Sequence, residues 1–521
     1  MRVVNLLVLV GCFCILTRPV DGQEQKYGML SGGFETNTVY YMKDGKTGAI
    51  RPDDRFGSNN YLNLDYQWRK FSIGVLFEAY VPVLQGLAGE LNDCGIVGKY
   101  VAFEDRDLKV RVGDFYEQFG SGMVFRAYEE RSLGLNTSVE GVRLFYSFRD
   151  KVNIKGIYGR PRRFMKHASS WVRGGDLQVD FGNILGWTET GVAVEGSFVN
   201  RYEEYVGNRE IESNVDAYSV RFALEHSGFS LRGEYAGKSK DPALYNNYTM
   251  EKGQGLLLEG GYVRKGMGIQ LNFRSLNRMV FRSSREAVGL EEGLNYLPAL
   301  TRQHTYSLAN LYAYATQGNG ETGGQVDFYY NFRKRTALGG KYGWKLQANF
   351  SAYYNLKEGL CSVGNELFYR DVNIDVTKKW SPSWKTVFFY SMQDFSPFVW
   401  GKPGKTYHAH IVVADAVYTW ANRYSLRLEG QHLWTKQDEG NWMALSAELG
   451  IAPAWSFFAA DMYNYGQTNI HYYNGGLSYS KSRTRVALQY GRNRAGVQCA
   501  GGVCREMPAY TGFNLTLTSS F

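Results

Sequence analysis

The residue types that bind metals or perform catalysis are few and scattered in this chain. Its 521 residues include 7 histidines, and two of these, His408 and His410, are separated by a single alanine. On a β-strand that spacing places both imidazoles on one face, where together they could bind a metal ion. Such a pair more often lines a lumen or a membrane interface, and we expect no metal and no other cofactor.

The cysteines offer a second possibility. The segment from Cys499 to Cys504 contains two glycines, so its ends can meet, and export to an oxidising compartment would permit a disulfide between them. A zinc site would need a second Cys or His pair nearby, and the sequence supplies none. Cys94 and Cys361 also lie in expected loops, and the sequence leaves open whether they pair.

Charged residues of both signs gather in one stretch, Asp114 to Val139, where strand-like alternation is interrupted. These charged residues are Asp114, Glu117, Arg126, Glu129, Glu130 and Arg131. One interpretation is an ordinary external loop, and another is a paired-carboxylate site for hydrolysis, although no residue is found that would position a substrate. A third is a segment folded into the interior of a barrel, its charges paired with wall residues such as Arg143 and Asp65. We adopt the third, in which segment 114–139 partly fills the lumen.

Sequence motifs that carry catalysis are not found. Phe119-Gly-Ser-Gly-Met123 has the wrong spacing for a Gly-x-Ser-x-Gly nucleophile elbow, and no metalloprotease, P-loop or dinucleotide-binding motif is present. His432 falls within an expected strand, but no serine partner can be assigned to it. We expect no catalytic residues and no enzymatic activity. The net charge of +9 is spread without a Lys/Arg run, so no nucleic-acid partner is expected.

Alternating apolar and polar residues recur along nearly the whole chain and predict β-strands throughout. Examples are Leu62 to Trp68, Phe229 to Tyr235, Val486 to Tyr490 and the terminal Thr511 to Phe521. Aromatic residues make up 15% of the chain and the mean hydropathy is −0.36. Beyond residue 22 no stretch approaches the roughly 20 apolar residues of a transmembrane helix. The apolar faces often end in Trp or Tyr, as at Trp68, Tyr424 and Trp434, which is typical of the aromatic girdles of a transmembrane β-barrel.

The connections between expected strands alternate between tight turns, such as Ser227-Gly228, and long polar loops, such as Lys43 to Ser58. Outer-membrane barrels have short turns on the periplasmic side and longer loops outside. We therefore predict an all-β fold over residues 23–521, a single antiparallel transmembrane barrel of 24–26 strands. The count stays open because Arg282 to Gln303 shows no clear alternation. Either Leu294 to Leu300 hides a strand, or a neighbouring strand is assigned wrongly.

Both ends of the sequence predict export to an outer membrane. The apolar run Leu6 to Leu16, with small or apolar residues before Gln23, predicts a signal peptide over residues 1–22. Acylation of Cys12 is a weaker alternative, because the apolar run continues beyond it. Bacterial outer-membrane barrels are similar in ending on an aromatic residue, here Phe521, which the barrel-assembly machinery reads. We expect that machinery and outer-membrane lipid as partners. Strands begin almost directly after residue 22, so no N-terminal plug domain is expected.

Three stretches carry a resemblance to a known family. They read GDFYEQFGSGMVFRAYEERSLGLN from Gly113, GGFETNTVYYMKD from Gly32 and TALGGKYGWK from Thr336. The sequence resembles, over all of the chain beyond the signal peptide, an uncharacterised outer-membrane β-barrel family of the Bacteroidota, a domain of unknown function. The resemblance implies a barrel fold and an outer-membrane location. It implies no activity.

The expected function is passage of a small solute through the polar lumen of a porin-like channel. Arg232, Arg427 and Arg485 lie on polar strand faces, where they would favour anionic solutes. Lumen carboxylates such as Glu234 and Glu429 could equally neutralise them. The alternative is a non-conducting barrel with a structural, assembly or secretion-associated role, or a surface adhesin, with other envelope proteins as partners.

Overall fold

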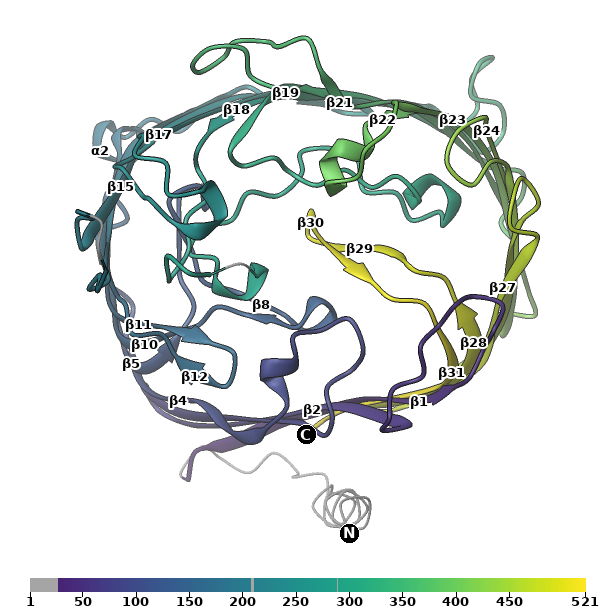
Figure 1. Ribbon diagram of the computed structural model, residues 1–521. Helices are drawn as coiled ribbons and strands as arrows, with labels where there is room; N and C mark the ends of the chain where they lie inside the picture. The colour runs from purple at the N-terminus through teal and green to yellow at the C-terminus, as the bar shows by residue number, and fades with distance from the viewer. Residues whose placement is uncertain (1–26, 208–209, 288) are drawn as a thin grey trace.

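A computed structural model describes residues 27–207, 210–287 and 289–521, and its strands close into one β-barrel (Figure 1). The main sheet has 25 strands, of which the short β12 pairs only with the end of β11, so 24 antiparallel strands form the wall. The expected all-β barrel is confirmed. The expected signal peptide, residues 1–22, lies outside the described residues. Within the described ranges, no helix is both long and apolar enough to cross a membrane.

The wall is built from long, regular strands. They are β1 (Met29–Met42), β2 (Phe56–Trp68), β3 (Phe71–Tyr80), β4 (Cys94–Glu104), β5 (Leu108–Phe115), β10 (Val139–Phe148), β11 (Val152–Arg163), β13 (Trp171–Asp180), β14 (Thr190–Tyr202), β15 (Asn214–His226), β16 (Phe229–Lys238), β17 (Gly253–Arg264), β18 (Met267–Asn277), β19 (Gly320–Phe332), β20 (Trp344–Tyr354), β21 (Leu367–Lys379), β22 (Trp384–Phe395), β23 (Tyr407–Trp420), β24 (Tyr424–Thr435), β25 (Trp442–Ile451), β26 (Trp455–Asn464), β27 (Ile470–Lys481), β28 (Thr484–Asn493) and β31 (Tyr510–Ser520).

The remaining elements are short and belong to the connections. They are the strands β6 (Gln118–Phe119), β7 (Phe125–Arg126), β8 (Glu129–Glu130), β9 (Leu135–Asn136), β12 (Lys166–His167), β29 (Gly496–Ala500) and β30 (Val503–Met507), the helix α2 (Phe181–Leu185), and 3-10 turns at Gly89–Leu91, Arg131–Leu133, Leu244–Asn246, Leu290–Glu292, Leu308–Asn310 and Pro397–Trp400.

The barrel closes where its last strand meets its first. β31 pairs with β1 from Gly33 opposite Ser520 to Met42 opposite Thr511, and backbone hydrogen bonds join Gly32 and Phe521 in both directions at 3.1 and 3.0 Å. Closure leaves the wall no open edge, which is the condition for a sheet in hydrocarbon, because unpaired backbone groups there cost several kcal/mol each.

Side-chain alternation decides which face of each strand looks outward. On β31, Phe513 and Leu515 are 45% and 41% exposed, whereas Asn514 between them is 9% exposed and lines an interior cavity. Exposed tryptophans mark both ends of the outer surface. Trp68 and Trp384 lie at strand ends beside tight turns, and Trp434 lies at a strand end beside a loop, as aromatic girdles at two membrane interfaces would.

The two rims differ in the length of their connections. At one rim the connections are mostly tight, and in the turn after β15 both Ser227 and Gly228 have positive φ, 46° and 83°, the conformation of a type I′ hairpin turn. At the other rim the loops are longer, and the longest is 278–319, between β18 and β19. Arg282 to Gln303 lies in this loop, and its described residues form no barrel strand, so the strand count is the lower bound of the predicted range.

Candidate functional site

Among the loops of the long-loop rim that fold into the barrel, three make direct contacts with one another. They are residues 116–138, 278–319 and 494–509, and together we call them the plug. Figure 1 shows β8 of the first loop and the β29–β30 hairpin of the third inside the ring of strands. The plug is packed against the wall: Phe119, Phe125 and Leu294 form one apolar cluster with the wall residues Val199 and Val215. The lumen is therefore largely filled by the chain itself.

The first plug loop carries most of the charged residues singled out in the sequence. Glu117 accepts a hydrogen bond from Arg143 Nε at 2.5 Å and from Lys155 Nζ at 2.9 Å, both on the wall. Burial alone would raise the pKa of Glu117, but the positive charges of Lys155 and Arg143 outweigh it and hold the pKa below its usual value. Glu117 thus remains an ionised anchor between the loop and β10–β11.

The far end of the same loop is anchored to a different part of the wall. Arg131 donates to Glu35 of β1 at 2.8 Å and to Glu129 at 3.0 Å, and its guanidinium lies 4.4 Å from the Tyr61 ring centre. Glu130 accepts a hydrogen bond from the backbone N–H of Ser132 at 3.2 Å and so caps the Arg131–Leu133 turn. The loop therefore links β10–β11 with β1 along the inside of the wall.

Not every expected partner is used. Arg143 pairs with the segment as anticipated, whereas Asp65 accepts its hydrogen bond from Tyr100 of the wall at 2.6 Å. Asp114, at the end of β5, accepts from the backbone N–H of Lys99 at 2.9 Å. Arg126 does not pair with a carboxylate within the described residues; its guanidinium carbon lies 3.9 Å from the ring centre of Tyr296 in the second plug loop.

Direct contacts join the three plug loops to one another. The backbone N–H of Tyr296 donates to Gly122 O at 2.9 Å, and that of Ala299 donates to Gly502 O at 2.9 Å. Arg505 of the third loop pairs with Glu291 of the second. A disulfide between Cys499 and Cys504 crosses the β29–β30 hairpin. Among the described residues, Cys94 and Cys361 are exposed and free.

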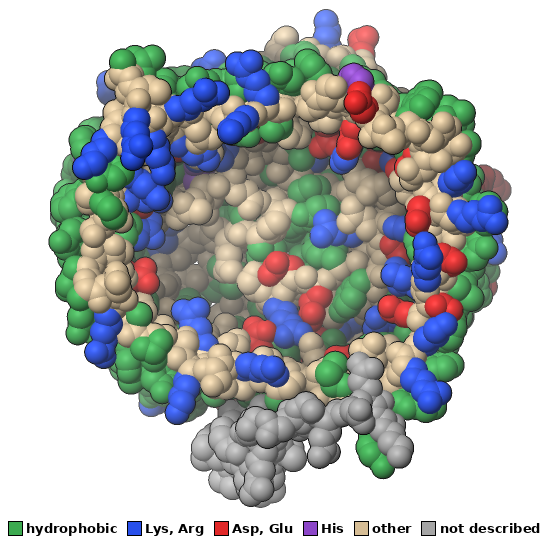
Figure 2. Space-filling view, turned by 180° about the vertical axis from the view of Figure 1, so that it is seen from behind, with side chains coloured by type: hydrophobic (Ala, Val, Ile, Leu, Met, Phe, Trp, Pro, Cys, Tyr) green, Lys and Arg blue, Asp and Glu red, His purple; other side chains and the backbone are tan. Residues whose placement is uncertain are grey.

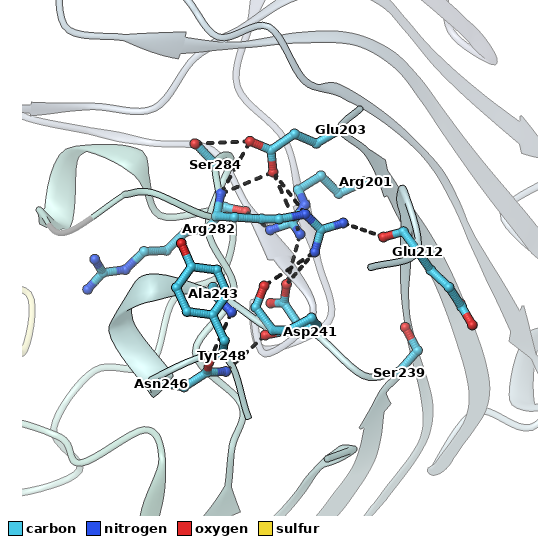
Figure 3. Close-up of polar contacts among 12 residues, drawn as sticks. Arg201, Glu203, Glu212, Ser239, Asp241, Ala243, Asn246, Tyr248, Arg282 and Ser284 are labelled. Carbon is cyan, nitrogen blue, oxygen red and sulfur yellow. Dashed lines mark hydrogen bonds and ion pairs between the residues drawn. The ribbon is translucent and has the colours of Figure 1, made fainter. Parts of the chain in front are cut away.

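A buried charge cluster holds one end of the second plug loop against the wall (Figure 3). Asp241 accepts from Arg201 of β14 at 2.8 Å and from Lys238 of β16 at 3.0 Å. Glu203 accepts from the backbone N–H of Arg285 at 3.0 Å, and the Arg285 guanidinium lies 3.9 Å from Asp241. Arg201, Lys238, Arg285 and Asp241 are each at most 3% exposed, so this anchor is shielded from solvent.

The other end of that loop is anchored to acidic wall residues farther around the barrel. Arg302 donates to Asp375 at 2.6 Å, and His304 Nε2 lies 2.7 Å from Asp371, both carboxylates being on β21. The backbone N–H of Leu308 donates to Gln431 of β24 at 3.0 Å. Sequence reasoning missed these anchors, because the loop shows no strand alternation and its partners lie about seventy residues or more away along the chain.

Space remains beside the plug, along β24–β28 and β31. A cavity of about 990 Å³ at the long-loop end is lined by Arg131, Gln431, Tyr472 and Arg494, among others. It shares Arg427 and Ser446 with a second cavity of about 480 Å³. That cavity in turn shares Glu448 and Arg485 with a third of about 540 Å³ beside the turn at 452–454. Figure 2, seen from behind, shows the interior hollowed, with acidic and basic side chains interspersed.

The three arginines proposed to tune the lumen differ in their surroundings. Arg427 donates to Asp415 at 3.0 Å and to Glu429 at 2.6 Å, so two carboxylates surround one cation. Arg232 pairs with Glu225 at 2.7 Å, both side chains being more than half exposed; Glu234 instead accepts from the backbone N–H of Ser121 in the plug. Arg485 lines the cavities of about 480 and 540 Å³.

His408 and His410, the pair considered for metal binding, contact separate partners. His408 Nδ1 lies 2.5 Å from Asp394, and His410 Nδ1 lies 2.9 Å from the hydroxyl of Tyr390. Each imidazole therefore has its own hydrogen-bond partner on the neighbouring strand β22.

The fold and its interior define a β-barrel plugged by its own loops. The chain belongs to the family of unknown function DUF6029, whose model matches residues 1–521. No curated protein matches the sequence. Among solved structures it is similar to the siderophore receptor PirA from Pseudomonas aeruginosa (9% identity, 97% of this chain and 81% of that one, TM-score 0.40). It is also similar to the copper transporter OprC (9%, 96% and 84%, 0.40) and to OccK9 (OpdG) from Pseudomonas aeruginosa (11%, 83% and 98%, 0.37).

Proposed function

We propose that the protein is an outer-membrane channel that conducts a small polar solute past the plug. The apolar outer surface, bounded by exposed tryptophans at strand ends, supports insertion into a bilayer. The polar interior supports passage of a hydrophilic solute. The observation that carries the proposal is the series of cavities along β24–β28 and β31, in which each cavity shares lining residues with the next from the long-loop rim to the tight-turn rim.

The proposal is tested by placing single cysteines on adjacent residues of β25 that face opposite sides. Ser446 lines the cavities of about 990 and 480 Å³, whereas Leu445 is 65% exposed on the outer surface. The background replaces the exposed free residues Cys94 and Cys361 with serine. In planar bilayers, a charged methanethiosulfonate reagent should reduce the conductance of S446C and leave that of L445C unchanged. A folded barrel with no discrete conductance would refute the channel and support the structural or assembly role instead.

Arg427 gives a second prediction, about ion selectivity. Because it lies between Asp415 and Glu429, Arg427→Ala leaves two uncompensated carboxylates beside the passage. We expect the reversal potential in a salt gradient to shift toward cation selectivity, and the shift to shrink at high ionic strength because salt screens the charges. Arg232→Ala is the control, since its partner Glu225 is exposed and Arg232 lines none of the three cavities. Equal shifts in the two variants would contradict the assigned passage.

A further inference from the structure

Two carboxylates face each other where the first plug loop leaves and rejoins the wall. Asp114, near the end of β5, is directly opposite Glu140, near the start of β10, so their side chains project from the same face of the sheet. Like charges directly opposite on neighbouring strands are destabilising. A positive charge between the two carboxylates would therefore stabilise this strand pairing.

His167 of β12 lies against both carboxylates, yet the contact with Asp114 is not a hydrogen bond. Its Nε2 is 3.5 Å from Asp114 Oδ1, and its Nδ1 is 3.3 Å from Glu140 Oε2. Asp114 is 7% exposed, and Asp114 Oδ1 and His167 Nε2 are both buried without a hydrogen-bond partner. An unsatisfied buried polar atom is destabilising, and here two such atoms lie 3.5 Å apart.

The other cations nearby do not fill this role. Arg160, directly opposite Glu140 on β11, donates from Nε to Ala168 O at 3.0 Å, and Arg111 donates from Nε to the backbone oxygen of Asp114 at 2.8 Å. The ammonium of Lys99 is 3.7 Å from the other oxygen of Glu140, Oε1, and its side chain is 70% exposed. The backbone N–H of Lys99 satisfies Asp114 Oδ2, which leaves Oδ1 unpartnered. The gap between Asp114 Oδ1 and the imidazole of His167 is thus lined by oxygen and nitrogen atoms that can donate an electron pair to a metal ion.

We propose that Asp114, Glu140 and His167 bind a divalent transition-metal cation of the Zn²⁺ class. One ligand atom from each residue lies within 4.8 Å of the other two. Metal–ligand bonds of about 2.1 Å in a tetrahedral site place ligand atoms roughly 3.4 Å apart, which matches the spacing between Asp114 Oδ1 and His167 Nε2. Two oxygens and one imidazole without thiolate suit Zn²⁺ or Mn²⁺ and not Cu(I).

The imidazole orientation fits a metal ligand held by a neighbouring carboxylate. With Nε2 bonded to the ion, Nδ1–H donates toward Glu140, the arrangement that fixes the ring of metal-binding histidines. Glu140 can contribute its second oxygen to the ion, and water completes the coordination. Because Asp114 and Glu140 bracket residues 116–138, the bound ion fastens the base of the first plug loop and the β12 segment together.

The test is zinc binding to the full chain in detergent, carrying a tag without histidines and first stripped with a chelator. Calorimetric titration with ZnCl₂ should show one site, lost in Asp114→Asn and in His167→Ala and weakened about 10–100-fold in Glu140→Gln. His471→Ala is the control, because His471 lies 2.6 Å from the single carboxylate of Asp461 at an exposed position.

A second measurement separates loss of the ion from loss of the fold. Zinc should raise the melting temperature of the wild type by binding the folded state and should leave that of His167→Ala unchanged, while circular dichroism verifies the barrel in each variant. The proposed site is wrong if His167→Ala and Asp114→Asn both bind zinc with the affinity of the wild type. It is also wrong if the wild type binds no zinc. In the latter case His167 only fills the space between the two carboxylates.

Discussion

Replacing residues 282–315 with a short Gly/Ser turn should raise the single-channel conductance severalfold. The removed residues make the central part of the plug: Tyr296 contacts the first plug loop, and Ala299 contacts the third. The replacement keeps the base of the loop, where the backbone N–H of Met279 donates to Gly318 O at 2.8 Å and extends the β18–β19 ladder. Barrels of 16–18 strands already enclose an aqueous channel, so a 24-stranded wall that has lost the central part of its plug should conduct strongly.

Two comparisons make this result specific. Shortening the exposed loop between β20 and β21, at Lys357 to Gly364, should leave conductance unchanged because most of this loop faces solvent. Removing the 282–315 segment also frees the carboxylates of Asp371 and Asp375 from His304 and Arg302, so the open pore should prefer cations. If the shortened protein folds as a barrel and conducts no better than wild type, the second loop does not limit the passage.

Asp241→Ala should destabilise the protein by about 3–5 kcal/mol. The substitution leaves the buried cations of Arg201 and Lys238 without their carboxylate partner, and an uncompensated buried charge carries a cost of this size. Unfolding in urea, followed by tryptophan fluorescence in detergent or lipid, measures the loss. The matched control is Glu225→Ala, whose partner Arg232 is 59% exposed in its side chain, and an exposed pair contributes about 0–1 kcal/mol. Similar losses in the two variants would contradict the anchoring role of the cluster.

The same cluster predicts how wild-type stability depends on acid. Burial alone would raise the pKa of Asp241, but the charges of Lys238 and Arg201 outweigh it and hold the pKa well below its usual range. The stabilisation is therefore present above the unfolded pKa of about 3.9 and is lost only as the pH falls through the lower folded pKa. The stability difference between wild type and Asp241→Ala should stay constant from pH 8 to pH 5. A difference that shrinks already near pH 6 would show that Asp241 is not held ionised in this way.

The fold followed from local information. Phe513 and Leu515 alternate with Asn514 because successive side chains of a strand point to opposite faces, and that rule needs no knowledge of the neighbouring strands. Tight turns such as Ser227-Gly228 punctuate the pattern for an equally local reason, since a type I′ turn requires positive φ at both positions. The sequence by itself therefore determined the strands, their outward faces and the barrel, together with the unusual character of residues 114–139.

Only the tertiary structure decided that two further loops, 278–319 and 494–509, join residues 116–138 in the lumen. The second plug loop has no repeating pattern, and its anchors, such as Arg302 to Asp375 and Arg285 toward Asp241, join residues that are distant along the chain. The same holds for Asp114, Glu140 and His167, which gather because the end of β5, the start of β10 and the short β12 meet at one rim. Such juxtapositions depend on strand order and register around a closed wall, and no periodicity along a single strand encodes them.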